Sequence, residues 1–235
     1  ISFTNKASDE LKRRCKQRCA DTKQSFFGTI DKFYISQIII PFSSHVTGNI
    51  TEYEIVDNID ESSKYALLLE EPFSSKKESI LVEGLQEGKI FLKYTGETAL
   101  YILENVPGAM QYIKARYSHI IIDENQDCGE IQDKVFIKLV ESGLTGIAVG
   151  DINQAIYGFT KRFPKYLIAL MKRDDFARFE LSKNHRCHPS ISEYSLCLFG
   201  ASKTVPREKR VFKVDISGDE RSIAAAIDKY LNQIK

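Results

Sequence analysis

Residues 117–127 read YSHIIIDENQD, and this stretch decides the predicted fold. The three consecutive isoleucines at 120–122 are typical of a strand buried on both faces of a parallel sheet. Asp123 and Glu124 follow where that strand is predicted to end. Ligands of open α/β sheets bind at the carboxyl ends of strands, where two acids can hold Mg²⁺ and position a water against a phosphate. For this stretch alone, a strand that ends in a polar turn is the alternative interpretation.

A second apolar run with the same outline lies downstream. Residues 146–149, GIAV, predict another buried strand, which ends at Gly150 and Asp151. Parallel strands bring their carboxyl ends to one edge of a sheet, so we expect Asp151 to join Asp123 there. The alternative is that Asp151 only caps the next helix. Strands that alternate with helices predict an α/β fold with a parallel sheet.

The N-terminal part of the chain predicts a strand end followed by a basic helix. Thr4 or Asn5 can cap that helix, whose residues 7–19 carry many lysines and arginines. Such a charge run is usually a solvated helix face, and the functional alternative is a surface that faces phosphates. A short strand before Gly28 and an apolar helix that stops at Pro41 are predicted next.

Residues 43–116 differ in composition from the flanking sequence, being rich in Ser, Glu and Lys. We interpret them as an insertion that packs on the main sheet. Within it, 79–85 and 89–94 flank Gln-Glu-Gly and predict a hairpin. A helix over 98–116, interrupted near Pro107, is predicted to follow. Downstream, helices are predicted over 131–141, 165–172, 190–199 and 221–234, and short strands over 178–181 and 211–214.

Composition narrows the class of protein. The chain has 235 residues, 43% of them apolar, which is enough for one large domain or two smaller ones. The net charge of +1 means that any nucleic-acid surface must come from local patches. No apolar run approaches the roughly 20 residues that span a bilayer, and no signal peptide is present. The five scattered cysteines favour reduced thiols in a cytoplasmic protein and lack the spacing of a zinc site.

Five segments share their order and spacing with the motifs of one family. They are FTNKAS at 3–8, GTIDKF at 28–33, DENQD at 123–127, VGDINQAIYGF at 149–159 and LSKNHRC at 181–187. Together they resemble motifs Ia, a GTF-like single-strand-binding motif, the Walker B motif, motif III and motif IV of UvrD/Rep-type superfamily 1 DNA helicases. The resemblance covers most of 1–42 and 117–195. A match to all five in order makes coincidence an unattractive explanation.

This resemblance implies a fold and a domain organisation. A RecA-like parallel sheet flanked by helices would form a first motor domain from 1–42 and 117–183. An inserted, mostly helical subdomain would occupy 43–116. Residues 184–235 would begin a second RecA-like domain.

The resemblance also implies roles in ATP chemistry. Asp123 would hold Mg²⁺ mostly through water, and Glu124, a second candidate metal ligand, would be the general base that orients the attacking water. Gln154 would sense the γ-phosphate, with Asp151 beside the nucleotide. Arg186 would stabilise charge on the transferring phosphoryl group, although a surface or hinge role is its alternative. ATP and Mg²⁺ are the implied cofactors.

Single-stranded or partly duplex DNA is the implied substrate. The candidate DNA-binding residues are Phe3, Thr4, Asn5, Lys6, Gly28, Thr29 and Tyr157. Aromatic stacking on bases is worth roughly 1–3 kcal/mol each and tolerates any sequence, which suits a translocating motor. For Tyr157, a place in the hydrophobic core is the alternative.

The chain departs from the family pattern at several positions. Asn125 replaces the usual alanine, His185 the usual tyrosine and Asp31 the histidine of many relatives, and Thr160-Lys161 replaces an arginine-glycine pair. These changes affect DNA contact and coupling more than ATP chemistry. The GTIDKF form and the apolar helix ending in PF are similar to the helicase-like subunit of the Gabija anti-phage defence system, which implies partnership with an OLD-type nuclease subunit in a hetero-oligomer.

No GxxxxGK[ST] phosphate loop occurs in the sequence. We therefore expect the chain to be the middle of a longer polypeptide and to be inactive in ATP hydrolysis alone. The function expected of the whole is an ATP-dependent DNA translocase or helicase in an anti-phage defence complex. The alternative is a non-hydrolysing DNA-sensing or assembly subunit that keeps the helicase fold as a scaffold. Another type of phosphate-loop switch, such as a GTPase, leaves FTNKAS and QAIYGF unexplained.

Overall fold

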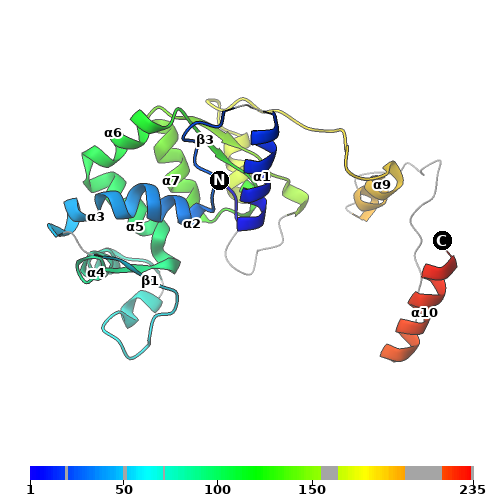
Figure 1. The fold of residues 1–235 in the computed structure, drawn as a ribbon, viewed down its shortest axis with the longest axis horizontal. Helices are drawn as coiled ribbons and strands as arrows, with labels where there is room; N and C mark the ends of the chain where they lie inside the picture. The colour runs from blue at the N-terminus through cyan, green and yellow to red at the C-terminus, as the bar shows by residue number, and fades with distance from the viewer. Residues whose placement is uncertain (19–20, 50–51, 71, 155–163, 199–218, 234–235) are drawn as a thin grey trace. The chain divides into compact units, whose positions relative to one another are not determined.

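The fold comes from a computed structural model that describes residues 1–18, 21–49, 52–70, 72–154, 164–198 and 219–233. The chain forms two compact units, 1–177 and 178–235. Figure 1 shows the helices of the first unit around its short strands. The fold is therefore a mixture of helices and short parallel strands, as predicted, and the domain boundaries given above remain predictions.

Parallel strands carry the central part of the first unit. β3 (His119–Ile122) pairs with β4 (Thr145–Ala148), with Ile120 opposite Gly146. On the other side of β3, the Asp123 N–H donates to the Ile1 carbonyl at 3.0 Å. Ser2 in turn forms a parallel bridge with Thr29. Four chain segments thus run side by side, in the order 28–29, 1–2, β3 and β4.

The prediction that β3 is buried on both faces is wrong. Ile120 and Ile122 are buried, whereas Ile121 is 48% exposed and Ile147 of β4 is 40% exposed. The buried face lies against helix α7 (Glu130–Glu141), which contacts both strands. Side chains alternate between the two faces of a strand, so covering one face buries every second residue.

Pro41 does not end the apolar helix, contrary to the prediction. α2 (Ile30–Phe33), a π-helical stretch (Tyr34–Ile39) and α3 (Ile40–Thr47) follow one another without a break. The Ile40 N–H reaches back five residues to the Ile35 carbonyl. Proline has no N–H and its ring clashes with the carbonyl four residues earlier. The wider π-turn just before Pro41 relieves that clash, so the helix continues.

The predicted hairpin within 79–94 is also wrong. Residues Ser75–Gln86 form helix α4, and β2 (Lys89–Phe91) pairs in parallel with β1 (Glu54–Val56). The buried residues of α4 are Lys77, Leu81, Gly84 and Leu85. Their spacing of three and four residues is the helical period, and it outweighs the turn signal that follows. The predicted interruption at Pro107 is confirmed, because α5 (Thr95–Asn105) ends there and α6 (Pro107–Arg116) begins.

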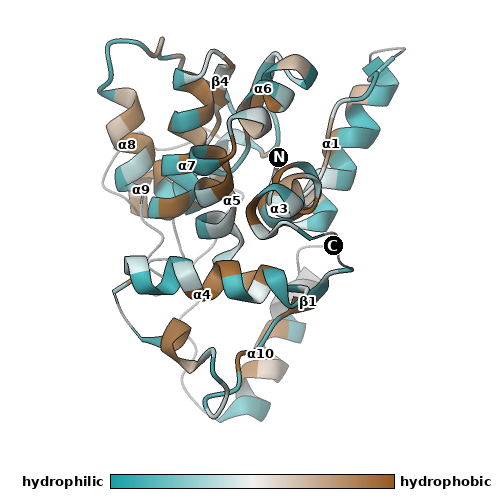
Figure 2. Cartoon of the chain, turned by 90° about the vertical axis from the view of Figure 1, so that its left-hand side faces the viewer, coloured by the Kyte–Doolittle hydropathy of each residue, from teal (hydrophilic) through white to brown (hydrophobic). Residues whose placement is uncertain are grey.

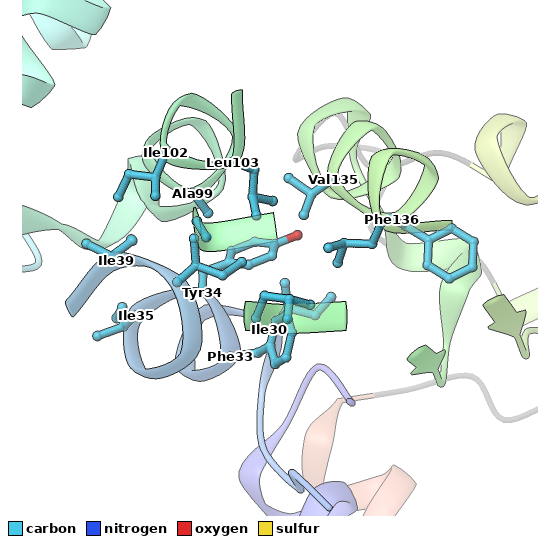
Figure 3. Close-up of a cluster of buried hydrophobic side chains, with 14 of the residues drawn as sticks. Ile30, Phe33, Tyr34, Ile35, Ile39, Ala99, Ile102, Leu103, Val135 and Phe136 are labelled. Carbon is cyan, nitrogen blue, oxygen red and sulfur yellow. The ribbon is translucent and has the colours of Figure 1, made fainter. Parts of the chain in front are cut away.

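The main hydrophobic core lies between the helix that begins at Ile30 and helices α5 and α7. Figure 3 shows the Tyr34 ring between side chains of α5, such as Leu103, and side chains of α7, such as Val135. Burial raises the pKa of the Tyr34 hydroxyl, which keeps that hydroxyl neutral. A second, smaller core joins the elements of 54–94 through Tyr65, Leu68, Leu81, Phe91 and Tyr94.

The remaining predicted helices are confirmed. They are α1 (Asn5–Arg18), α8 (Lys165–Met171), α9 (Pro189–Leu198) and α10 (Glu220–Gln233). Short 3₁₀ turns occupy Ala66–Leu69, Leu92–Tyr94, Asn125–Asp127 and Ile152–Gln154. Figure 2 shows that α1 is largely hydrophilic. No described helix has both the length and the apolar character needed to cross a membrane.

The strand predicted over 178–181 does not form. Phe179 is 89% exposed and Leu181 is 93% exposed, and no strand is assigned to these residues. A lone extended segment without a paired neighbour leaves its backbone groups to water. The strand predicted over 211–214 lies outside the described residues.

Candidate functional site

The turn after β3 presents two carboxylates. Asp123 ends the strand, and its Oδ1 accepts a hydrogen bond from the Glu124 N–H at 3.1 Å. Glu124 has left-handed backbone angles, φ 57° and ψ 40°. This conformation is uncommon outside glycine, and it redirects the chain into the 3₁₀ turn Asn125–Asp127. The Glu124 side chain is exposed and the Asp123 side chain is half-buried.

The turn after β4 lies beside the turn after β3. The Asn125 N–H donates to the Val149 carbonyl at 2.8 Å, which extends the strand pairing beyond β4. Asp151 then organises its own turn, since Oδ1 accepts from the Asn153 N–H at 2.9 Å and Oδ2 from Gln154 Nε2 at 2.7 Å. Asp151 thus caps the 3₁₀ turn Ile152–Gln154, which was the alternative role considered for it.

A buried glutamine joins the two turns. Gln126 is 2% exposed, and its Nε2 donates to Glu124 Oε2 at 2.8 Å. Its Oε1 accepts from the Asp151 N–H at 3.0 Å. Sequence analysis missed this residue, because only its place between two acids in DENQD singled it out. The structure therefore brings Asp123, Glu124, Asp151 and Gln154 to one edge of the strands.

The N-terminal segment reaches the same edge. Phe3 to Lys6 directly follow Ser2, which pairs beside Thr29. Thr4 accepts from the Ala7 N–H at 3.1 Å and so caps α1, as predicted. Phe3 is half-buried and packs against the main core, whereas Asn5 and Lys6 are exposed.

Gly28 and Thr29 complete this side of the edge. The Gly28 carbonyl accepts from the Ser2 N–H at 3.1 Å. Thr29 caps α2 by accepting from the Lys32 N–H at 3.3 Å, and Lys32 Nζ donates to Asn5 Oδ1 at 2.8 Å. The predicted DNA-contacting residues at 3–6 and 28–29 are therefore neighbours across the Ser2–Thr29 bridge.

Two predicted residues fall outside this arrangement. Arg186 belongs to the second unit, where it is exposed and its N–H donates to Asn184 Oδ1 at 2.8 Å. The Cys187 N–H shares that oxygen at 3.0 Å, so Asn184 forms a tight polar turn before α9. Tyr157 lies outside the described residues.

The oxygen donors at the edge suit magnesium. Carboxylate oxygens are the ligands that Mg²⁺ prefers, and it is usually bound through one or two carboxylates, several waters and substrate phosphates. In the described part of the chain, the Asp123 carboxylate accepts only the Glu124 N–H. Asp123 and Glu124 therefore fit such an ion. No cluster of three or more His, Cys, Asp or Glu side chains among the described residues could hold a metal by itself.

The departures from the family pattern have local partners. Asn125 is 1% exposed, and its Nδ2 lies 3.5 Å from Cys128 Sγ. Asp31 Oδ1 accepts from Thr95 Oγ1 at 2.7 Å, which links α2 to the start of α5. Both substitutions thus make polar contacts inside the first unit, which alanine at the first position could not make.

A family model matches part of the chain. Residues 89–173 match the model described as the UvrD/REP helicase N-terminal domain. This range contains Asp123, Glu124, Gln126, Asp151 and Gln154. The resemblance to UvrD/Rep-type helicases is therefore confirmed.

Individual relatives extend the similarity. Gabija protein GajB of Bacillus cereus (strain VD045) is 29% identical over 218 residues, which is 89% of this chain and 41% of that protein. An ATP-dependent helicase/nuclease protein of Oenococcus oeni is 24% identical over 175 residues, 72% of this chain and 14% of that protein. The exonuclease/helicase protein RexA of Lactococcus lactis subsp. cremoris is 30% identical over 106 residues, 43% of this chain and 9% of that protein. The chain thus spans less than half the length of each of these proteins.

Proposed function

We propose, from the similarity of residues 89–173 to the UvrD/REP helicase N-terminal domain, that this chain is part of an ATP-dependent DNA translocase or helicase. The observation that carries the proposal is the shared edge of the four parallel segments. Acids and amides at 123–124 and 151–154 follow two of these segments, and the candidate DNA-contacting residues at 3–6 follow a third. This is the edge where open α/β sheets bind ligands.

In this proposal the chain builds one side of an ATP site on a RecA-like sheet. Asp123 holds Mg²⁺, which supplies charge neutralisation on the phosphates when bound. Glu124 accepts a proton from the attacking water, for which its exposed carboxylate is suited. Gln154, held by Asp151, contacts the γ-phosphate. Arg186, at the start of a second RecA-like domain, stabilises charge on the transferring phosphoryl group.

The proposed DNA-contacting surface lies on the N-terminal side of the same edge. Thr4, Asn5 and Lys6 present exposed polar and cationic groups at the first turn of α1. Backbone N–H groups and a positive helix end attract phosphate. Phe3, Gly28, Thr29 and Tyr157 complete the proposed set. Single-stranded or partly duplex DNA is the substrate that this surface suits.

The similarity to Gabija protein GajB supports a wider setting. We propose that the complete protein works in the cytoplasm, in an anti-phage defence complex that also contains an OLD-type nuclease subunit. Size-exclusion chromatography with light scattering on the co-expressed operon measures the assembly. A hetero-oligomer is expected, and elution of two separate proteins under all conditions would contradict it.

Glu124→Gln in the complete gene product tests the enzymatic proposal. Removing a general base lowers turnover by about 10²- to 10⁴-fold, so DNA-stimulated ATP hydrolysis should fall by that factor. Glu130→Gln is the matched control, since Glu130 is an exposed acid at the start of α7 that pairs with Lys134. The control should keep normal turnover.

Unchanged hydrolysis in Glu124→Gln, or no DNA-stimulated hydrolysis in the unmodified protein, would overturn the proposal. DNA binding without hydrolysis would then favour the scaffold alternative, a DNA-sensing or assembly subunit.

A further inference from the structure

The Gln126 side chain has one partner at each end. Nε2 donates to the Glu124 carboxylate, and Oε1 accepts from the backbone N–H of Asp151. A carboxylate can only accept and an N–H can only donate, so the amide cannot be turned round without losing both bonds. The contact distances of 2.8 and 3.0 Å are those of ordinary hydrogen bonds.

The first of these bonds restrains an otherwise free side chain. Glu124 is exposed, and an exposed glutamate samples many rotamers. Gln126, at 2% exposure, is held by the surrounding atoms and offers its N–H from a fixed position. Hydrogen bonds to a charged acceptor are about twice as strong as neutral ones. The bond therefore selects one orientation of the Glu124 carboxylate.

The second bond depends on close approach of the turn after β4. A Cβ atom at Gly150 would lie 2.6 Å from Gln126 Oε1, so only glycine leaves room for this contact. The bonded Asp151 also receives the Gln154 amide on its Oδ2. An unbroken chain of hydrogen bonds thus runs from Glu124 through Gln126 and Asp151 to Gln154.

We propose that Gln126 is a positioning residue that couples the orientation of Glu124 to the turn that carries Gln154. This inference rests on the proposed function and deepens it. When Gln154 contacts the terminal phosphate, the shift of its turn is passed through the Asp151 N–H and the Gln126 amide to the carboxylate that accepts the proton. Gln126 itself touches neither nucleotide nor water.

Gln126→Ala in the complete gene product is the first test. Loss of a partner that orients a reacting group typically costs about 10- to 100-fold in activity. The kcat for ATP should fall by that factor, while KM for ATP changes little, because ground-state nucleotide binding does not need an oriented base. Hydrogen exchange of the Asp151 N–H should become faster.

Gln132→Ala is the matched control. Gln132 also accepts one backbone hydrogen bond, from the Gly129 N–H at 3.0 Å, but contacts neither acidic turn. It should lose similar thermal stability and keep its kcat. A purely structural role of Gln126 predicts the same behaviour for both variants.

Gln126→Glu separates the two ends of the side chain. One oxygen of the new carboxylate can still accept from the Asp151 N–H, whereas the other faces Glu124 without a proton to donate. Protection of the Asp151 N–H from exchange should therefore persist while kcat falls.

The results distinguish this inference from the proposed function. Normal kcat in Gln126→Ala beside a loss in Glu124→Gln would overturn the positioning role alone. A fall of kcat and a rise of KM in step with lost thermal stability would also overturn it. Normal turnover in both variants would overturn the proposed function.

Discussion

At the scale of single residues, Gly150 shows how closely the two acidic turns approach. A Cβ atom there would lie 2.6 Å from Gln126 Oε1, 2.8 Å from Leu167 Cδ2 and 3.1 Å from the Gln126 backbone nitrogen. The side chains of Gln126 and Leu167 are both buried, so they have little room to move. The glycine is therefore needed for its missing side chain.

Gly150→Ala should lower the free energy of unfolding by about 1–3 kcal/mol, the usual cost of overpacking. Urea denaturation of the purified protein measures it. Gly108→Ala is the control, since a Cβ there meets no atom within 4 Å and alanine suits the helix α6. Equal stabilities of the two variants would contradict the crowding that the structure indicates.

At the scale of elements, α5 begins with a carboxylate in an unfavourable place. An acid in the first turn of a helix is normally stabilised by the helix dipole. Glu97 is instead mostly buried, its Oε2 accepts no hydrogen bond from the described residues, and Asp31 lies nearby. Burial, opposed by Lys93 and Lys134, raises the pKa of Glu97 above its ordinary value of 4.5. The ionised form therefore destabilises this end of α5 at neutral pH.

The sign of the pH dependence follows from this raised pKa. Between pH 4.5 and the folded-state pKa, the folded protein keeps a proton that the unfolded chain has lost. The contribution to stability is complete below pH 4.5 and disappears as pH rises through the folded-state value. Glu97→Gln should raise Tm at pH 7 by about 2–4 °C, the shift that ~1 kcal/mol produces in a chain of this size.

Thermal melts of Glu97→Gln and the unmodified protein at pH 7 and at about pH 4 measure this difference. The gain should vanish at the lower pH. Glu61→Gln, on an exposed loop, is the control and should leave Tm unchanged at both values. A gain of the same size at both pH values would show that side-chain packing, and not ionisation, is responsible.

At the scale of the whole molecule, charge bears on DNA binding. The net charge of +1 gives no overall attraction to phosphates, so affinity must come from cations placed at the edge of the strands. Lys6 is exposed in the first turn of α1, beside the other candidate DNA-contacting residues, whereas Lys32 already donates to Asn5. Lys6 is therefore the exposed cation most directly placed for a backbone phosphate.

Lys6→Ala should reduce the steepness of the salt dependence of single-stranded DNA binding. Each phosphate contact contributes about 0.7 to the slope of log K against log salt, so the slope should become shallower by about 0.7. Fluorescence anisotropy with a labelled oligonucleotide over a salt series measures it. Lys76→Ala on α4 is an exposed control that should keep the original slope. The same slope in all three proteins would exclude Lys6 from the interface.

The sequence by itself determined the strands at 120–122 and 146–149, the helices with clear periodicity and the pair Asp123–Glu124. Those features depend on local residue type and spacing, which the chain displays openly. The acidic motif and its neighbours also sufficed to recognise the resemblance to UvrD/Rep-type helicases, which the family model confirms.

Only the tertiary structure decided the features that depend on distant neighbours. The helix through Pro41 continues because a π-turn precedes it, and 75–86 is helical because one face of α4 is buried. The bridge from Glu124 through Gln126 to Asp151 joins residues 25 positions apart. No local pattern predicts such a contact, because side-chain partners are set by which segments pack together and how closely their backbones approach.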